Sequence, residues 1–180
     1  RGEMACGEYG EGKMSSPEQI CKYVINYFSE KNIIKHKNLK ALVTAGPTKE
    51  YIDPVRFITN NSSGKQGYEI AKSLAKFGIK TTLISGPSIL KKPENVNIIK
   101  VETADQMYEA TKKILPVDIA VCTAAVTDFK PATYQRKKIK KEISSINLEK
   151  NVDILEFLSK NNSHRPKLVV GFAAETNDVL

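Results

Sequence analysis

The sequence predicts an α/β protein with a Rossmann-like open sheet, mainly parallel, and with helices on both faces of that sheet. From residue 39 onward, short apolar runs of strand length alternate with amphipathic segments of helical period. Small residues stand where four of the five apolar runs end, which allows a ligand to approach the backbone closely. In sheets of this class ligands bind at the carboxyl ends of the strands, so we expect the functional site along that edge.

Composition indicates an ordinary globular chain. The 180 residues suffice for a domain with a substantial core, and no apolar run approaches the roughly 20 residues that span a bilayer. The net charge of +8 raises the possibility of nucleic-acid binding, but the lysines are scattered over the whole chain, as on a solvated surface, and a basic balance equally suits an enzyme with anionic ligands. The charged start lacks the features of a signal peptide. Three cysteines without framework spacing and two distant histidines argue against disulfides and zinc, and favour the cytoplasm.

The first residues are expected to be separate from this α/β part. Residues 1 to about 14 are glycine-rich and predict a loop, after which Ser16 is expected to cap a helix with Pro17 in its first turn. Apolar residues between Ile20 and Phe28 give this helix one apolar side. Residues 29–38 are polar and read as a linker.

The α/β part follows in order. Strands are expected over residues 39–45, 80–85, 96–101, 118–124 and 167–173. Helices are expected over residues 67–77, 104–114 and 152–160.

A polar loop between the first strand and the first of these helices is the first candidate site. It ends in Ser62-Ser63-Gly64-Lys65-Gln66-Gly67, and either serine is expected to cap the helix, where free N–H groups favour an anion. The segment fails the Walker A pattern, and only Gly46 of the dinucleotide fingerprint lies at the first turn. From the residues alone, a surface loop with a capped helix is as well supported as an anion site.

A second candidate site follows the strand expected over residues 118–124. Asp128 can hydrogen-bond a sugar or a base amine, or it can simply cap a turn. The basic run RKKIKK, residues 136–141, is by itself more typical of a solvated segment than of a mobile lysine loop that closes on phosphates.

Seven short motifs follow one another along the chain: TAGPT (44–48), DPVR (53–56), NxSSGKxG (60–67), AAVxD (124–128), KIKK (138–141), KNVDIL (150–155) and GFAAET (171–176). Together, and in this order, they resemble the phosphopantothenate–cysteine ligase domain of the bacterial bifunctional coenzyme A biosynthesis protein. One departure is Val152, which replaces the family's proline at a helix start. The resemblance assigns residues 39–180 to the ligase domain, without its C-terminal part.

The resemblance implies coenzyme A biosynthesis by ligation of phosphopantothenate with cysteine through an acyl-cytidylate, with CTP as a substrate. Mg²⁺ is expected to be held chiefly by the triphosphate, so no metal-binding residue is assigned. Asn60 would hydrogen-bond the reacting carboxyl group, Arg56 would neutralise or position the substrate, and Lys138 would stabilise charge at the phosphates. A homodimer is also implied. The nucleotide would contact Gly46, Ser62, Ser63, Gly64, Ala124, Asp128, Lys138, Val152, Asp153, Ile154, Leu155 and Phe172.

The segment ACGExGEGKM, residues 5–14, resembles the end of the phosphopantothenoylcysteine decarboxylase domain, which is a flavin enzyme. By that resemblance residues 1–28 are its C-terminal remnant, the FMN site lies outside the chain, and Cys6 is a relic of the proton donor. Because the family continues past GFAAET, the alternative is a catalytically incompetent fragment that binds nucleotide or a partner subunit. A separately encoded decarboxylase or C-terminal piece would then be a partner. An NAD-dependent oxidoreductase of the same sheet class is disfavoured by the missing fingerprint.

Overall fold

The computed structural model describes residues 2–3, 9–10, 16–31, 36, 38–140, 144–160 and 163–173. The chain divides into two compact units, Arg1–Ile34 and Lys35–Leu180. Three predictions fall outside the described residues: the role of Cys6, the end of the basic run at Lys141, and the last half of GFAAET, residues 174–176.

The first unit contains a helix, α1, over Pro17–Lys31, and two short antiparallel strands, β1 (Gly2–Glu3) and β2 (Tyr9–Gly10). The Ser16 hydroxyl accepts a hydrogen bond from the backbone N–H of Gln19, and the Gln19 side chain accepts from Ser16, which confirms the predicted cap. Residues 1–14 were predicted to be loop, whereas Gly2–Glu3 and Tyr9–Gly10 form a short antiparallel pair, because a pair of two-residue strands shows no period in the sequence.

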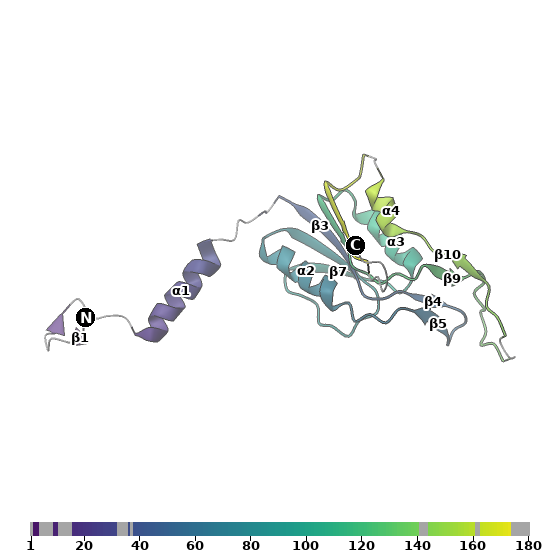
Figure 1. The fold of residues 1–180 in the computed structure, drawn as a ribbon, viewed down its shortest axis with the longest axis horizontal. Helices are drawn as coiled ribbons and strands as arrows, with labels where there is room; N and C mark the ends of the chain where they lie inside the picture. Colours follow the sequence, from purple (N-terminus) through teal and green to yellow (C-terminus); the bar gives the residue numbers. More distant parts are fainter. Residues whose placement is uncertain are drawn as a thin grey trace. The chain divides into compact units, whose positions relative to one another are not determined.

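The second unit is built on a sheet of five strands in the order β11-β8-β3-β6-β7, drawn in Figure 1. Every neighbouring pair is parallel. From β3 the chain adds β6 and β7 on one side and then β8 and β11 on the other. This change of direction between β3 and β8 creates a crevice at their carboxyl ends. The predicted fold class is therefore confirmed. The strands are β3 (Lys40–Ala45), β6 (Lys80–Ser85), β7 (Val96–Lys100), β8 (Ile119–Cys122) and β11 (Leu168–Gly171).

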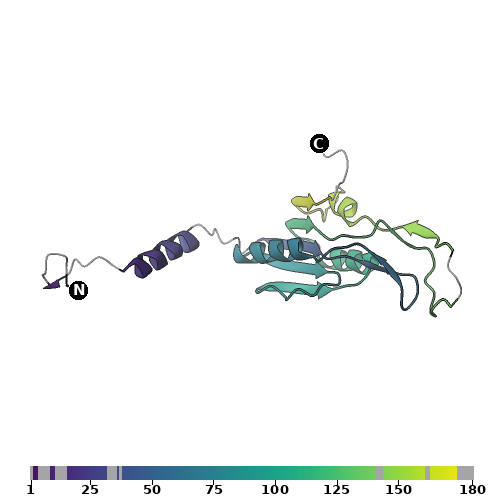
Figure 2. The same ribbon diagram turned by 60° about the horizontal axis from the view of Figure 1, so that its bottom comes forward.

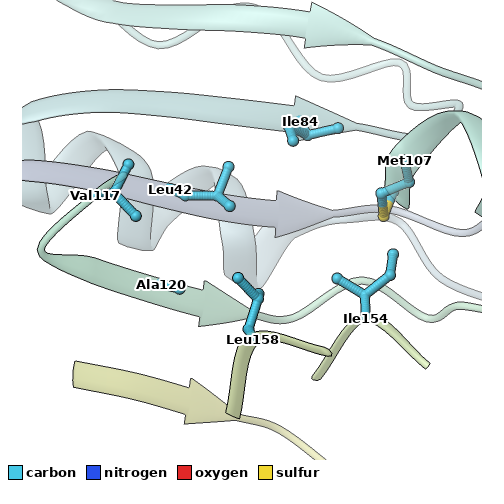
Figure 3. Packing of buried hydrophobic residues seen from close by; sticks show 7 residues of the cluster. All are labelled: Leu42, Ile84, Met107, Val117, Ala120, Ile154 and Leu158. Carbon is cyan, nitrogen blue, oxygen red and sulfur yellow. The ribbon is translucent and has the colours of Figure 1, made fainter. Parts of the chain in front are cut away.

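Helices cover both faces of this sheet. Alternate side chains of β3 point to opposite sides, so both faces carry apolar side chains that a helix can bury. Val43 packs on one face with residues of α2 (Lys65–Lys76). Leu42 packs on the other face with Met107 of α3 (Ala104–Ile114) and Leu158 of α4 (Ile154–Ser159), as Figure 3 shows. Each large side chain buried in this way contributes about 1.5–3 kcal/mol.

Two small antiparallel ribbons extend from the carboxyl edge of the sheet (Figure 2). β4 (Lys49–Tyr51) pairs with β5 (Phe57–Thr59), and β9 (Phe129–Pro131) pairs with β10 (Leu148–Lys150). β4 lies against β9. The sequence predicted only a loop between β3 and α2, which was wrong, since strands of three residues are too short to show a period.

Asp118 ties together three strands at the opposite, amino edge of the sheet. Its carboxylate accepts the backbone N–H of Lys40 at 3.0 Å and contacts the Lys167 ammonium at 3.0 Å. The Lys40 N–H, and then the Lys167 side chain, hold the pKa of Asp118 below its ordinary value. This residue therefore belongs to the scaffold and lies away from the ligand-binding edge.

None of the helices in the described part of the chain combines the length and apolar character needed to cross a membrane.

Candidate active site

The loops that follow β3 and β8 are bonded to each other across the crevice. The backbone N–H of Ala125 donates to Gly46 O at 2.9 Å, and that of Thr48 donates to Ala125 O at 3.4 Å. Gly46 has a φ of +78°, and a Cβ there would lie 3.3 Å from Gly86 O. Glycine is therefore required at the turn, and two of the recognised motifs, TAGPT and AAVxD, meet here.

A buried polar network supports these loops from below. Thr48 Oγ1 accepts the backbone N–H of Thr127 at 3.2 Å, and Asn151 Nδ2 donates to Thr127 O at 2.9 Å. All three side chains are buried. The sequence alone predicts no function for them, because isolated Thr and Asn residues in loops show no period. The available signal was that each lies inside one of the separate motifs.

A pocket of about 220 Å³ opens at the carboxyl ends of β8 and β11. Its base includes Thr44 and Cys122, at the switch point of the sheet. The structure brings together here most of the residues predicted to contact nucleotide. These are Ala124, Asp128, Val152, Asp153, Ile154, Leu155 and Phe172.

Backbone bonds fix the wall of this pocket. Asn151 N–H donates to Asp128 O at 2.8 Å, and Asp153 Oδ1 caps α4 by accepting from Glu156 N–H at 2.8 Å. Phe172 continues the β11–β8 ladder by donating its N–H to Cys122 O at 3.1 Å, and 48% of its surface is exposed. A partly exposed ring and a backbone-lined wall are suited to a planar heterocycle that carries hydrogen-bonding groups.

Cys122 gives this pocket an unreactive thiol. Burial raises the pKa of Cys122 to about 11, and a hydrogen bond with Thr44 offsets only part of that effect. Each unit of pKa lowers the thiolate fraction tenfold, so the thiolate fraction of Cys122 at pH 7 is about a hundredfold below that of a thiol with the ordinary pKa of 9.0. Since burial also restricts access, we expect Cys122 to be alkylated far more slowly at pH 7 than the exposed Cys21. Mass spectrometry of the alkylated peptides measures both sites, and the rate at Cys122 should rise steadily with pH. Equal rates at pH 7 would contradict the assignment.

The cap of α2 differs from the prediction. The N-cap is Gly64, with φ 77°, and no side chain caps the helix. The hydroxyls of Ser62 and Ser63 accept instead from the N–H groups two residues ahead, each at 3.3 Å. The reason is tertiary: a Cβ at Gly64 would lie 3.0 Å from Gly46 N, so the chain passes this point in a left-handed conformation that favours glycine.

Ser62 and Ser63 line a different cleft from the other predicted nucleotide contacts. This cleft, of about 770 Å³, lies at the carboxyl ends of β6 and β7 and also contains Lys49 and Lys100. The predicted nucleotide set is therefore divided between two hollows on either side of β3. Gly46 and Gly64 lie between them, in backbone contact with each other.

The three predicted catalytic residues lie on the loops around this edge. Asn60 directly follows β5, and its Nδ2 donates to Ala125 O at 3.3 Å and to Val126 O at 3.2 Å. These bonds hold the Asn60 side chain against the loop after β8. Arg56 lies in the turn between β4 and β5, where its Nη2 donates to Ile139 O at 3.4 Å. Lys138 is exposed and directly precedes Ile139, so the structure brings its backbone to the Arg56 turn. Lys138 does not line the smaller pocket.

Within the described ranges, no group of three or more Asp, Glu, His or Cys side chains is arranged to hold a metal ion. The loops at this edge offer the cations of Arg56 and Lys138 and the amide of Asn60 to an anionic ligand.

Comparison with known proteins supports one family. Residues 36–180 match the family model described as the DNA/pantothenate metabolism flavoprotein C-terminal domain. The chain is 45% identical over 183 residues to the coenzyme A biosynthesis bifunctional protein CoaBC of Vibrio vulnificus (strain YJ016), covering 99% of this chain and 45% of that protein. CoaBC of Bacillus subtilis (strain 168) is 41% identical over 182 residues, covering 99% of this chain and 44% of that protein.

The solved structure of the C-terminal domain of a coenzyme A biosynthesis bifunctional protein CoaBC is also similar. It has 42% sequence identity and a TM-score of 0.70, with 83% of this chain and 70% of that chain covered. The present chain spans less than half the length of the two curated relatives, 45% and 44%.

Proposed function

The chain belongs to the DNA/pantothenate metabolism flavoprotein C-terminal domain family, and we propose that it ligates phosphopantothenate with cysteine in coenzyme A biosynthesis, with CTP as the activating nucleotide. The observation that carries this proposal is the pocket at the switch point of the sheet. Segments from AAVxD, KNVDIL and GFAAET, which are far apart in the sequence, supply its lining. The names of the CoaBC relatives support the pathway.

The proposed reaction has two steps. A carboxylate oxygen of phosphopantothenate attacks the α-phosphorus of CTP, the bond to the β-phosphate breaks, and pyrophosphate leaves with its electron pair. The amine of cysteine then attacks the acyl carbon of this acyl-cytidylate, loses a proton and displaces CMP, which leaves the amide. A carboxylate is a poor acyl donor, so activation as a mixed anhydride provides the leaving group that the second step needs.

The residues at the edge of the sheet have distinct proposed roles. The smaller pocket takes the cytidine, with the Phe172 ring against the base. Asn60, held on the loop after β8, hydrogen-bonds the reacting carboxyl group. Arg56 and Lys138 supply positive charge where two anions must meet, which is the largest electrostatic cost of the first step.

The proposal also covers the metal ion, the location and the oligomeric state of the protein. Mg²⁺ enters with the triphosphate as part of the substrate, and the chain acts in the cytoplasm. The exposed Phe57, Phe129 and Leu148 on the two ribbons favour a homodimer. Residues 1–28 are proposed as the end of a decarboxylase domain that holds FMN elsewhere, residues 29–38 as a linker and residues 39–180 as the ligase domain.

The test is pyrophosphate release by the purified chain supplied with phosphopantothenate, Mg²⁺ and CTP but without cysteine. We expect release that requires phosphopantothenate, and amide formation once cysteine is added. The matched control replaces phosphopantothenate with pantothenate, which lacks the phosphate. CTP binding without release would reduce the assignment to nucleotide binding, and absence of both would overturn it.

A further inference from the structure

Asp53 is a fully buried carboxylate in the turn between β4 and β5. Its Oδ1 accepts the backbone N–H of Val55 at 2.8 Å and that of Arg56 at 2.9 Å. These bonds form an Asx turn, which an asparagine makes equally well. The local turn therefore explains one oxygen of Asp53 and does not require its charge.

The second oxygen reaches a distant segment. Asp53 Oδ2 accepts the backbone N–H of Ile139 at 3.2 Å and lies 3.5 Å from Arg56 Nη1. Arg56 Nη2 in turn donates to Ile139 O at 3.4 Å. Both backbone polar groups of Ile139 are thus held by side chains of the DPVR turn. A further bond joins the same two segments, from Gln135 N–H to Ile52 O at 2.9 Å.

Ile139 lies within the basic run, whose like charges would otherwise favour an extended conformation. Arg136, Lys137, Lys138 and Lys140 are exposed, whereas Ile139 between them is half-buried. A run of like charges repels itself and favours a solvated, extended chain. The bonds from Asp53 and Arg56 oppose this tendency at the residue next to Lys138.

The ionised form of Asp53 suits this clamp. Burial alone would raise its pKa, but the N–H groups of Val55, Ile139 and Arg56, together with the guanidinium of Arg56, outweigh burial and hold the pKa below its ordinary value. Asp53 is therefore charged at neutral pH and accepts all three N–H groups.

We propose that Asp53 is a positioning residue that clamps Ile139 to the DPVR turn and so fixes Lys138 beside Arg56 as one cationic unit. The catalytic part of this inference rests on the proposed function, whereas the clamp itself does not. A lysine held in place acts on the transition state without first losing chain entropy, so loss of the clamp should lower kcat more than it changes KM for CTP.

Asp53→Asn isolates the clamp. The Asn oxygen can keep the bonds to Val55 and Arg56, while its NH₂ group would face the Ile139 N–H, where two donors cannot bond. The matched control is Asp118→Asn at the opposite edge of the sheet, because Asp118 also accepts a backbone N–H and also contacts a cation.

The first readout is limited trypsin digestion of the full chain, with cleavage after Arg136 and Lys137 measured by mass spectrometry. Asp53→Asn should be cut there about tenfold faster than the wild type, because cleavage follows local opening and a charged hydrogen bond has been lost. Asp118→Asn should be cut at the wild-type rate at these two sites. An unchanged rate in folded Asp53→Asn would overturn the clamp.

A second variant keeps the test decisive if Asp53→Asn does not fold. Ile139→Pro removes the N–H donor and leaves the DPVR turn intact. It should show the same faster cleavage after Arg136. Wild-type protection in this variant would equally overturn the clamp.

The second readout is pyrophosphate release. In Asp53→Asn, kcat should fall about tenfold or more with KM for CTP little changed, and adding Lys138→Gln should cost much less than it does in the wild type. Fully additive losses would show that Asp53 does not act through Lys138 and would overturn the positioning role. Absence of release by the wild type would count against the proposed function alone, since the trypsin result still decides the clamp.

Discussion

Lys138→Gln is expected to lower kcat for pyrophosphate release by about 10²–10³-fold while leaving the fold intact. Glutamine keeps most of the length of the side chain but removes the charge that offsets the negative charge of the phosphates. Lys138 is exposed, and its segment is anchored through the backbone of Ile139, so the substitution removes no contact of the core. Steady-state pyrophosphate release measures kcat, and thermal unfolding checks the fold.

Lys140→Gln is the matched control, because Lys140 is an exposed lysine of the same basic run. We expect it to change kcat less than about threefold, since catalysis by a charged group depends on its exact placement and a lysine two positions away is not placed as Lys138 is. Equal losses in the two variants would assign the effect to the general positive potential of the run. That result would contradict a specific role for Lys138.

The sheet and its helices could be predicted because they are long and periodic. The strand from Lys80 to Ser85 and the helix from Ala104 to Ile114 have the predicted bounds, and other elements differ by one to three residues at their ends. Burial on both faces makes a parallel strand a continuous apolar run, and a surface helix shows a 3.6-residue period, so both patterns are visible in a single sequence.

Features that depend on tertiary contacts could not be predicted in this way. The short ribbons β4–β5 and β9–β10 are stabilised by their neighbours rather than by a pattern of their own. Gly64 replaces a serine as the cap of α2 because the chain must pass close to Gly46. Both the ribbons and the Gly64 cap depend on residues distant in the sequence, so no short stretch of sequence predicts them.

The candidate site could be predicted as a set of residues but not as a shape. Motifs at the carboxyl ends of parallel strands must gather along one edge, which is why Ala124 and Asp128, after β8, and Phe172, after β11, line one pocket. Sequence could not separate Ser62 and Ser63 into another cleft, because that depends on which side of β3 each loop folds. The DPVR motif was visible, but the partner of Asp53 lies 86 positions away at Ile139.

Gly86→Ala is expected to lower the free energy of unfolding by about 3 kcal/mol, which would lower Tm by roughly 10 °C for a domain of this size. Gly86 directly follows β6, and a Cβ there would collide with the carbonyl oxygen of Pro47 and lie 2.9 Å from Pro47 C. Backbone atoms cannot rotate away, and Gly86 N–H is already fixed to Ala45 O at 2.9 Å. The loop after β3 would have to move, which urea and thermal unfolding can measure.

Gly171→Ala is the matched control for this prediction. A Cβ at Gly171 would also be crowded, but by the terminal methyl groups of Leu155, which can rotate toward solvent because this side chain is 38% exposed. We expect a loss of less than about 1 kcal/mol, since a flexible neighbour can relax. Equal losses would show that crowding at Gly86 is relieved as easily. Pro47, which a Cβ at Gly86 would displace, pairs with Ala125 across the crevice. If Gly86→Ala lowers the free energy of unfolding more than Gly171→Ala does, we therefore expect it to weaken CTP binding as well.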